Sequence, residues 1–397
     1  MARTCFAPPR AAYVHVPFCR HRCGYCNFTL VAGRDDLVGD YLRAIELELS
    51  SGGTVRQNHC CDELLMGRAH PAAHAVDTLY FGGGTPTYLS TQQLRQLSRA
   101  ALWRHPLAPG HEWTLEANPT DVNERMISTL ADLGVTRLSL GGQSFHAGKL
   151  RLLERDHEAQ QVLNAAALAR GAGLSVAIDL IFATPGETLA NWEADLDATL
   201  ALQPDHVSTY GLTFERGTAF WIRRLRGQLS EVDEELQRDM YALAIERLTA
   251  AGFEHYEVSN FARPGCRSRH NQAYWSGEGY FAYGPGAARY IDGVRETNHR
   301  STTTYLKRML AGESPVAEHE ELTPEGRARE LLVFGLRRMA GLSRKEFSER
   351  TGYDVETLIG ESLRSFVDLG LLGDDGQRIR LTRKGLFISD ALWPEML

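Results

Sequence analysis

Short β-rich runs alternate with longer segments of helical apolar spacing in the first half of the chain, and this alternation constrains the fold most. The β-rich runs are residues 12–17, 78–81, 113–117, 137–140, 175–182 and 206–212. Helical spacing recurs between them, for example at residues 41–49, 94–103 and 162–170. A strand followed by a helix, repeated about six times, predicts a parallel sheet in an α/β fold.

Several of these predicted strands end in turns rich in Gly, Pro and polar residues. The turns are residues 82–86 (GGGTP), 116–119 (EANP), 141–144 (GGQS) and 184–186 (TPG). A βα barrel builds its site from the loops that follow its strands, whereas a doubly wound sheet has one dominant phosphate loop at its switch point. Because polar turns follow strand after strand, we expect an open, partial (β/α)6 TIM-like barrel.

The pattern changes to helices from about residue 322 and ends in a predicted hairpin around residues 373–376. Helices followed by a hairpin are typical of a winged-helix unit. Residues 321–397 hold 12 Lys+Arg and 13 Asp+Glu, which is a poor electrostatic footprint for DNA binding. We therefore predict a partial barrel over 1–230, a connecting region over 231–320 and a winged-helix-like domain over 321–397.

The composition limits the classes of binding partner and the cellular compartment that we expect for this protein. Lys+Arg 43 against Asp+Glu 50 gives a formal net charge of -7, so we expect no nucleic-acid partner. We find no uninterrupted apolar stretch near the ~18 residues of a membrane span, and no signal-peptide pattern at the start. Seven cysteines, an odd number, do not indicate a disulfide framework. These features favour a cytoplasmic protein.

The segment 50–75 carries scattered histidines and cysteines, namely His59, Cys60, Cys61, His70 and His74. A metal site is one interpretation. The residues lack the compact repeated spacing of metal ligands, and adjacent cysteines do not easily turn to one ion, so we favour a surface insertion.

The strongest motif is a C-x3-C-x2-C run formed by Cys19, Cys23 and Cys26, directly after the first predicted strand. Soft thiolates select zinc, copper(I) or iron-sulfur centres. Three of them on one loop can hold three corners of a four-iron cluster and leave the fourth iron open. Zinc completed by His15 or His21 is an alternative, as are three unrelated thiols.

This run, with an aromatic residue before its last cysteine, resembles the radical S-adenosylmethionine (SAM) superfamily. Four further segments are similar, in order and spacing, to the oxygen-independent coproporphyrinogen III oxidase branch. They are residues 80–87 (YFGGGTPT), 116–119 (EANP), 139–145 (SLGGQSF) and 179–182 (DLIF). The match runs from Tyr13 to about Arg289, and the winged-helix-like tail fits it.

The resemblance implies a [4Fe-4S] cluster in which the three cysteines bind three irons and SAM chelates the fourth. One electron from the cluster then cleaves a C–S bond of SAM. Gly83 and Gly84 let the backbone approach the ligand because they lack a Cβ, and Thr85 adds a hydroxyl. An ordinary tight turn is the alternative for these glycines.

Five more positions take roles from the same resemblance. Glu116 would accept hydrogen bonds from the ribose hydroxyls of SAM, which a carboxylate does better than a neutral group. Gln143, Arg155 and Asp179 fall where that branch contacts a second bound SAM, and Tyr13 falls where it contacts the first. The alternatives are a salt-bridged acid at the barrel rim for Glu116 and a solvated helix residue for Arg155.

Two features separate branches of the superfamily. Coproporphyrinogen oxidases continue the motif to a fourth cysteine, where this chain has Phe28. Residues 269–275 (RHNQAYW) contain H-N-x-x-Y-W, which is similar to the sequence associated with haem binding in HemW-type haem chaperones. The resemblance implies haem binding at His270, with aromatic surface beside it. A hydrogen-bonded core cluster is the alternative for His270, and Cys266 is the alternative ligand.

The leading hypothesis is a HemW-type haem chaperone that keeps the radical SAM site but lacks coproporphyrinogen dehydrogenase activity. The second is a coproporphyrinogen dehydrogenase that decarboxylates propionates, and the third is a radical methyl or other transferase. The chaperone hypothesis implies haem, a haem-accepting client protein, a small flavin or iron-sulfur electron donor, and peripheral contact with membrane-associated clients.

Overall fold

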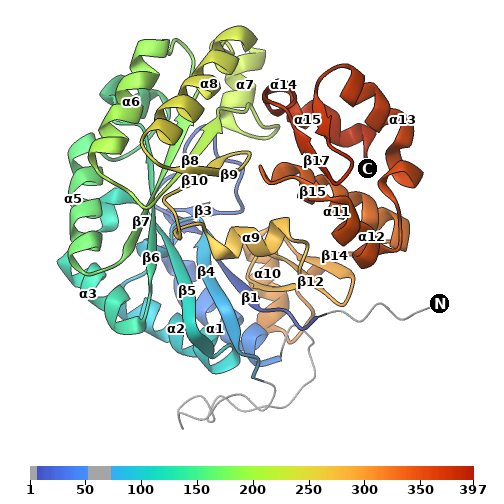
Figure 1. The fold of residues 1–397 in the computed structure, drawn as a ribbon. Coiled ribbons are helices and arrows are strands. Elements are labelled where there is room, and N and C mark those ends of the chain that lie inside the picture. The colour runs from blue at the N-terminus through green and yellow to red at the C-terminus, as the bar shows by residue number, and fades with distance from the viewer. Residues whose placement is uncertain (1–6, 52–72) are drawn as a thin grey trace.

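The computed structural model describes residues 7–51 and 73–397, and its centre is a curved sheet of parallel strands with helices on the outside (Figure 1). The parallel strands are β1 (Ala11–Val16), β4 (Val76–Gly83), β5 (Leu107–Ala117), β6 (Arg137–Gln143), β7 (Ser175–Phe182) and β8 (His206–Gly211). The helices that follow them are α1 (Val38–Ser51), α2 (Thr91–Arg104), α3 (Glu124–Leu133), α4 (Ala147–Leu152), α5 (Ala159–Gly171), α6 (Leu189–Ala201), α7 (Ala219–Leu225) and α8 (Glu234–Ala250).

Further strands extend this sheet at both edges. They are β9 (Glu254–Glu257), β10 (Asn260–Ala262), β11 (Tyr280–Tyr283), β12 (Ala288–Ile291), β13 (Val294–Asn298) and β14 (Val316–Glu321). The strand order is β14-β13-β12-β11-β1-β4-β5-β6-β7-β8-β10-β9, with β11 parallel to β1 and antiparallel pairing further out. The sheet is therefore open, and α9 (Arg269–Trp275) and α10 (Thr302–Leu310) connect its outer strands.

Burial on both faces explains why these strands are apolar runs. In β7 the consecutive residues Val176, Ala177 and Ile178, which point to opposite faces in turn, are all buried, as parallel strands covered by helices require. Helix starts are marked by capping boxes, such as Ser90 with Gln93 at α2, which satisfy exposed backbone N–H groups.

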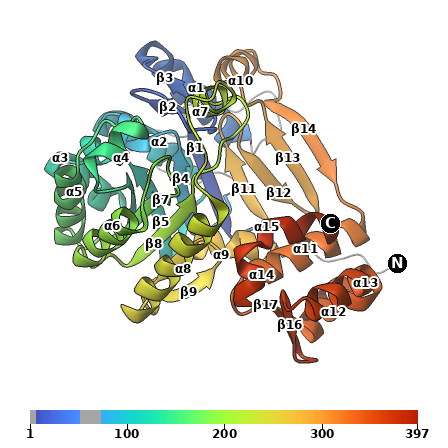
Figure 2. The ribbon, with the colours of Figure 1, turned by 90° about the horizontal axis from the view of Figure 1, so that it is seen from above.

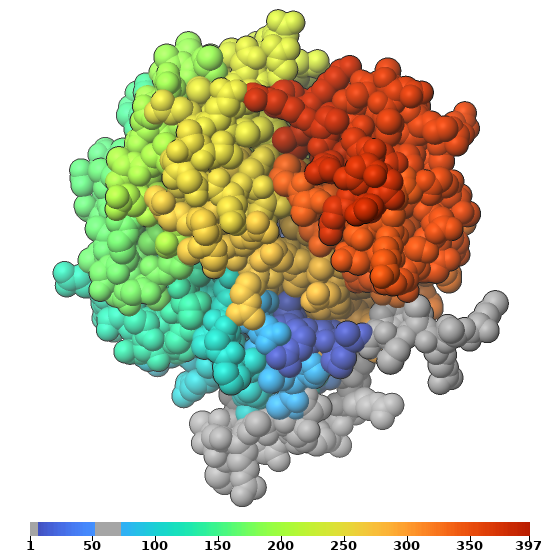
Figure 3. All heavy atoms as spheres, in the orientation of Figure 1, coloured from blue at the N-terminus to red at the C-terminus, as the bar shows by residue number. Residues whose placement is uncertain are grey.

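The C-terminal part packs beside the barrel and has a hydrophobic core of its own (Figures 2 and 3). Its core includes Leu332, Ile379 and Met396. A small sheet has the order β15-β17-β16. The elements are α11 (Pro324–Arg337), β15 (Leu342–Ser343), α12 (Arg344–Thr351), α13 (Val355–Asp368), β16 (Leu372–Asp374), β17 (Arg378–Leu381), α14 (Arg383–Phe387) and α15 (Ser389–Leu392).

The predicted fold class, a partial barrel followed by a helical, winged-helix-like part, is confirmed. What sequence did not anticipate is that residues 254–262 and 280–321 add strands to both barrel edges. The boundaries at 230/231 and 320/321 stay predictions. Most of the predicted insertion at 50–75 lies outside the described residues. Within residues 7–51 and 73–397, no helix has the length and apolarity to cross a membrane.

Candidate functional site

The cysteine motif forms a short loop at the carboxyl end of β1. Cys19 ends the strand β2 (Phe18–Cys19), which pairs with β3 (Val31–Ala32). The backbone N–H of Cys26 donates to the carbonyl of Cys23 at 3.0 Å, and the side chain of Arg22 donates to the carbonyl of Leu30 at 2.8 Å. These bonds fold the loop back on itself, so that the three thiols surround one space.

That space is a cavity of about 770 Å³ at the carboxyl ends of the parallel strands, hereafter the cluster cavity. Ten predicted site residues line it. They lie on the cysteine loop, on the strands β4 to β7 and on the segments that follow these strands. They are Cys19, Cys23, Cys26, Gly83, Gly84, Thr85, Glu116, Gln143, Arg155 and Asp179.

Polar groups lie against two of the sulfurs. Thr85 Oγ1 is 3.3 Å from Sγ of Cys19, and Nη1 of Arg155 is 3.6 Å from Sγ of Cys23. Burial raises the pKa of Cys19 to about 11 and also raises the pKa of Cys26. Both thiols are therefore protonated at neutral pH in the free protein, and iron binding must release their protons.

The donor set fits a four-iron cluster. Three thiols on one loop line a single cavity. Thr85 can hydrogen-bond to one of the sulfurs, and such bonds help to set the reduction potential of iron-sulfur clusters. In the described part of the chain, no three His, Cys, Asp or Glu side chains converge where a single metal ion could bind.

Both histidines of the zinc alternative have other partners. His15 Nδ1 lies 3.0 Å from the hydroxyl of Tyr13, and its Nε2 lies 2.7 Å from the carbonyl of Thr29. His21 Nε2 is hydrogen-bonded to the carbonyl of Glu154 and lies 3.7 Å from Sγ of Cys23. His15 does not line the cluster cavity, whereas His21 does.

Gly83 and Gly84 are glycines for a reason that differs in part from the prediction. Gly83 has a φ of +108°, and a Cβ there would lie 2.3 Å from the ring of His15. A Cβ on Gly84 would lie 2.6 Å from the carbonyl oxygen of Phe18. Both residues line the cavity, but the space that they leave is filled by His15 of β1 and by the backbone of Phe18 just after it. Their smallness holds the cysteine loop against β4.

Glu116 is the penultimate residue of β5 and lies on the floor of the cavity. Tyr80 Oη donates to its Oε1 at 2.7 Å, and the N–H of Gly83 donates to its Oε2 at 2.9 Å. Burial raises the pKa of this carboxyl to about 7, which these hydrogen bonds partly oppose. A carboxylate has about four lone-pair sites, so acceptor capacity remains for a ligand.

The remaining predicted residues come from β6, β7 and the segment between α4 and α5. Gln143 stands at φ +61°, a left-handed conformation that is strained for a side-chain-bearing residue. Arg155 Nη2 donates to Asn118 Oδ1 at 3.0 Å and to the carbonyl of Gly141 at 2.9 Å. Asp179 accepts from Ser139 at 3.3 Å. Arg155 is therefore part of the cavity wall, not a solvated helix residue.

A buried charge network lies behind Gln143, and sequence reasoning missed it. Lys149 Nζ donates to Glu187 at 2.5 Å and to Asp195 at 3.0 Å, and all three side chains are at most 3% exposed. Asp195 also accepts from Ser144 Oγ at 2.7 Å. This network holds the turn that follows β6. Ser144 belongs to the GGQS turn at residues 141–144, but no local sequence pattern indicates that it contacts residues 149, 187 and 195.

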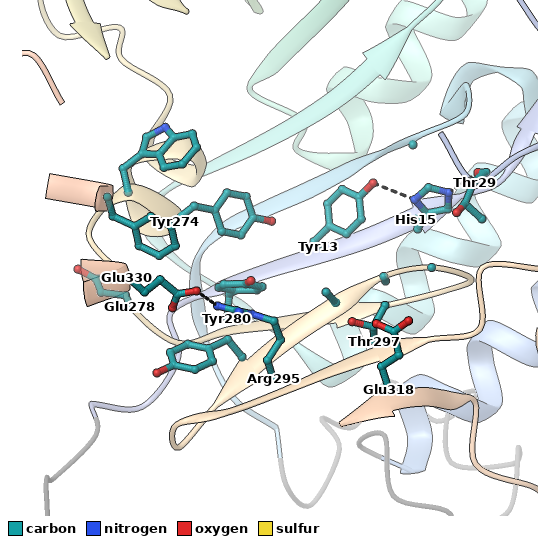
Figure 4. A pocket seen from close by; sticks show the side chains of 18 of the residues that line it. Tyr13, His15, Thr29, Tyr274, Glu278, Tyr280, Arg295, Thr297, Glu318 and Glu330 are labelled. Atoms are coloured by element: carbon teal, nitrogen blue, oxygen red, sulfur yellow. Dashed lines mark hydrogen bonds and ion pairs between the residues drawn. The ribbon is translucent and has the colours of Figure 1, made fainter. Parts of the chain in front are cut away.

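Two predicted residues, Tyr13 and His270, do not line the cluster cavity. Tyr13 lines a second cavity of about 770 Å³ between α9, the strands β11–β14 and α11, hereafter the outer cavity (Figure 4). His270 is 1% exposed and lines neither cavity. Its Nδ1 lies 2.8 Å from Thr78 Oγ1 and its Nε2 lies 2.9 Å from Tyr274 Oη. Burial lowers the pKa of His270 to about 3, so the ring is neutral.

The two cavities adjoin. Asn27, Phe28, Gly83, Glu116 and Arg300 line both of them. Phe28, at the position of the fourth cysteine in the coproporphyrinogen branch, is 65% exposed and stands between the two spaces. A ligand in one cavity would therefore share wall residues with a ligand in the other.

Comparison with known proteins agrees with this geometry. Residues 13–198 match the Radical SAM superfamily, and residues 322–388 match the HemN C-terminal domain. The chain is 34% identical over 390 residues to the Heme chaperone HemW of Lactococcus lactis, covering 98% of this chain and 97% of that protein. It belongs to the HemW family. The HemW protein of Bacillus subtilis is 32% identical over 392 residues, covering 98% of this chain and 99% of the relative.

Another relative is a protein of Danio rerio described as Radical S-adenosyl methionine domain-containing protein 1, mitochondrial. It is 30% identical over 399 residues, covering 97% of this chain and 86% of that protein. Among solved structures, coproporphyrinogen III oxidase (HemN) from Escherichia coli matches with a TM-score of 0.82 at 22% identity, covering 98% of this chain and 90% of that one. That likeness shows the fold. Radical SAM membership implies a [4Fe-4S] cluster and SAM.

Proposed function

We propose that this chain is a haem chaperone, which binds a [4Fe-4S] cluster and SAM and which binds haem and delivers it to a client protein. The observation that carries the proposal is the nearly full-length similarity, at 32 and 34% identity, to relatives described as Heme chaperone HemW. Phe28 in place of a fourth cysteine and the H-N-x-x-Y-W segment at residues 270–275 support it.

In this proposal Cys19, Cys23 and Cys26 hold three irons of the cluster, which supplies single electrons to SAM when bound. Thr85 Oγ1, 3.3 Å from Sγ of Cys19, donates to that sulfur once the thiolate forms. The glycines at the end of β4 keep the cysteine loop close to the strand.

The other wall residues orient the nucleotide. The Glu116 carboxylate accepts hydrogen bonds from ribose hydroxyls, and Asp179 provides a second acceptor on the same floor. Arg155 supplies positive charge between the cluster loop and the ends of β5 and β6. Gln143 offers an amide at the end of β6. Tyr13 acts from the outer cavity, through the wall formed by Gly83 and Glu116.

Haem binds beside α9, whose Tyr274 and Trp275 face the outer cavity while Asn271 faces the cluster cavity. His270, between them, belongs to the motif through which we propose that haem is held. Delivery requires a client protein that accepts haem, and such clients include membrane-associated proteins. A small flavin or iron-sulfur protein donates the electron that reduces the cluster.

The test is a direct comparison under anaerobic conditions. Reconstituted protein is titrated with haem, mixed with apomyoglobin as a haem acceptor, and separately incubated with reductant, SAM and coproporphyrinogen. The proposal predicts one haem bound per chain, transfer of that haem to apomyoglobin, and no consumption of coproporphyrinogen. Decarboxylated product without haem binding would establish the dehydrogenase instead.

A further inference from the structure

The outer cavity has the size and the walls of a site for a flat aromatic ligand. Its volume of about 770 Å³ lies within the range of about 300–1,000 Å³ typical of small-molecule sites. Rings from five structural elements and the cysteine loop line it, and such faces stack on planar macrocycles. The rings belong to Tyr13, Phe28, Tyr274, Trp275, Tyr280, Tyr290 and Phe334.

Two buried polar atoms on this wall have no hydrogen-bond partner within the described residues, namely Tyr290 Oη and Trp275 Nε1. A buried polar group without a partner is costly, so such groups mark places where an occupant can contribute bonds. The wall also carries Arg295, Arg300 and Arg327 together with several glutamates. Because both charge signs are present, charge alone does not select the occupant, and the aromatic faces do.

The side chains that the H-N-x-x-Y-W segment presents to this cavity are those of Tyr274 and Trp275, not that of His270. Tyr274 lines the cavity, and Figure 4 shows its hydroxyl directed toward Tyr13. His270 lies behind it with one nitrogen on Thr78 and the other on the Tyr274 hydroxyl. An iron atom in the cavity therefore has access to the phenolic oxygen, whereas the imidazole is reached only through it.

We propose, resting on the haem-chaperone function above, that ferric haem occupies the outer cavity with the phenolic oxygen of Tyr274 as its iron ligand and His270 as a positioning residue. Tyrosine is an established type of haem ligand, as in catalase. When the Fe–O bond forms, the phenolic O–H bond breaks and its proton leaves to solvent. The buried imidazole of His270 stays neutral and donates the N–H of Nε2, 2.9 Å away, to the phenolate oxygen. No electron moves, and the iron stays ferric.

A residue that hydrogen-bonds to a metal-ligating side chain fixes the orientation and the basicity of that side chain. His270 has this relation to Tyr274. It predicts different roles for two residues of one motif. Loss of Tyr274 removes the bond to iron, whereas loss of His270 weakens that bond and leaves its chemical type unchanged.

The experiment compares ferric-haem complexes of the full-length, cluster-loaded protein and five variants by resonance Raman and absorption spectroscopy, with haem affinity from titration. We expect a phenolate-to-iron signature in the unchanged protein, in His270→Ala and in His270→Gln. Affinity should fall roughly 10- to 100-fold in His270→Ala and recover in part in His270→Gln, which keeps an N–H donor. Tyr274→Phe should lose the signature, and Tyr274→His should replace it with an imidazole signature.

Tyr280→Phe is the matched control, because it removes the same atom from a ring 4.6 Å from that of Tyr274 on the same wall. It should keep the phenolate signature. Tyr274→Phe controls for misfolding, because it changes the same position without adding a ligand and should show neither signature. An imidazole signature in the unchanged protein, lost in His270→Ala and kept in Tyr274→Phe, would overturn the proposal and leave the chaperone function intact. Absence of haem binding by the unchanged protein would overturn both.

Discussion

Arg155 Nη1 lies 3.6 Å from Sγ of Cys23, and its other terminal nitrogen bonds to Asn118 and Gly141 at the ends of β5 and β6. One guanidinium thus joins the cysteine loop to two strands of the cluster cavity. Lysine has no planar fork and cannot make all three contacts from one position. This side chain links the cluster side of the cavity to the side where we place the nucleotide.

Arg155→Lys should therefore weaken SAM binding and leave the iron content unchanged. We expect a loss of about tenfold in affinity, equivalent to about 1.4 kcal/mol, because one charge-assisted contact is lost. Anaerobic calorimetric titration with SAM measures it. Arg151→Lys, on the exposed end of α4, is the control and should bind SAM normally. Equal SAM affinity in both variants contradicts the role given to Arg155.

SAM binding should depend on pH through Glu116. Its pKa is raised by burial to about 7, so below pH 7 the free protein carries a protonated carboxyl that must lose its proton to accept from ribose hydroxyls. Affinity should be constant well above pH 7 and should fall below it, approaching about tenfold per pH unit for a single linked proton. In Glu116→Gln this dependence should flatten. An unchanged pH profile in that variant would remove Glu116 from the binding site.

Removing the buried ammonium of Lys149 should destabilise the fold strongly. Lys149→Met leaves Glu187 and Asp195 as buried carboxylates without their cation, and breaking a buried pair in this way costs about 3–5 kcal/mol. Urea unfolding measures the loss. Arg95→Met breaks the exposed Arg95–Asp132 pair and should cost no more than about 1 kcal/mol. Similar losses in the two variants would show that the network is not as buried as described.

Phe28 should contribute to ligand binding and little to stability. Its side chain is 65% exposed, so Phe28→Ala should change the free energy of unfolding by no more than about 0.5 kcal/mol. Because Phe28 lines both cavities, the same variant should bind haem more weakly. Urea unfolding and haem titration on one preparation separate the two effects. Unchanged haem affinity would place the haem away from Phe28.

Local patterns predicted the barrel and most of the cluster cavity, because each motif follows its own strand and parallel strands end at one edge. The turns after β4, β5 and β6 needed no long-range information to be placed together. The same reasoning failed for the sheet edges. The short strands β9 to β14 carry mixed apolar and charged residues. Their attachment to the barrel depends on distant pairings, and β11 pairs with β1, more than 200 residues away in the chain.

The side-chain environment of His270 also could not be predicted from the sequence. The motif identified the segment, but whether His270 or Tyr274 meets a ligand depends on the contact with Thr78, 192 residues away in the chain. Likewise, Arg155 as an isolated residue looked like a solvated helix position, and only the fold brings it to Cys23. Sequence motifs locate a site, whereas the direction in which each side chain points depends on the tertiary structure.

The central claim, that the thiols at positions 19, 23 and 26 hold a four-iron cluster, is tested most directly by iron and sulfide analysis with absorption spectra of anaerobically reconstituted protein. Cys266, which lies outside the cluster cavity, provides the matched control. We expect about four irons per chain, with the brown chromophore perturbed by added SAM, in the unchanged protein and in Cys266→Ala. Alanine at any of the three motif positions should abolish the chromophore. A chromophore retained in all three variants, or zinc in place of iron in the unchanged protein, would contradict the claim.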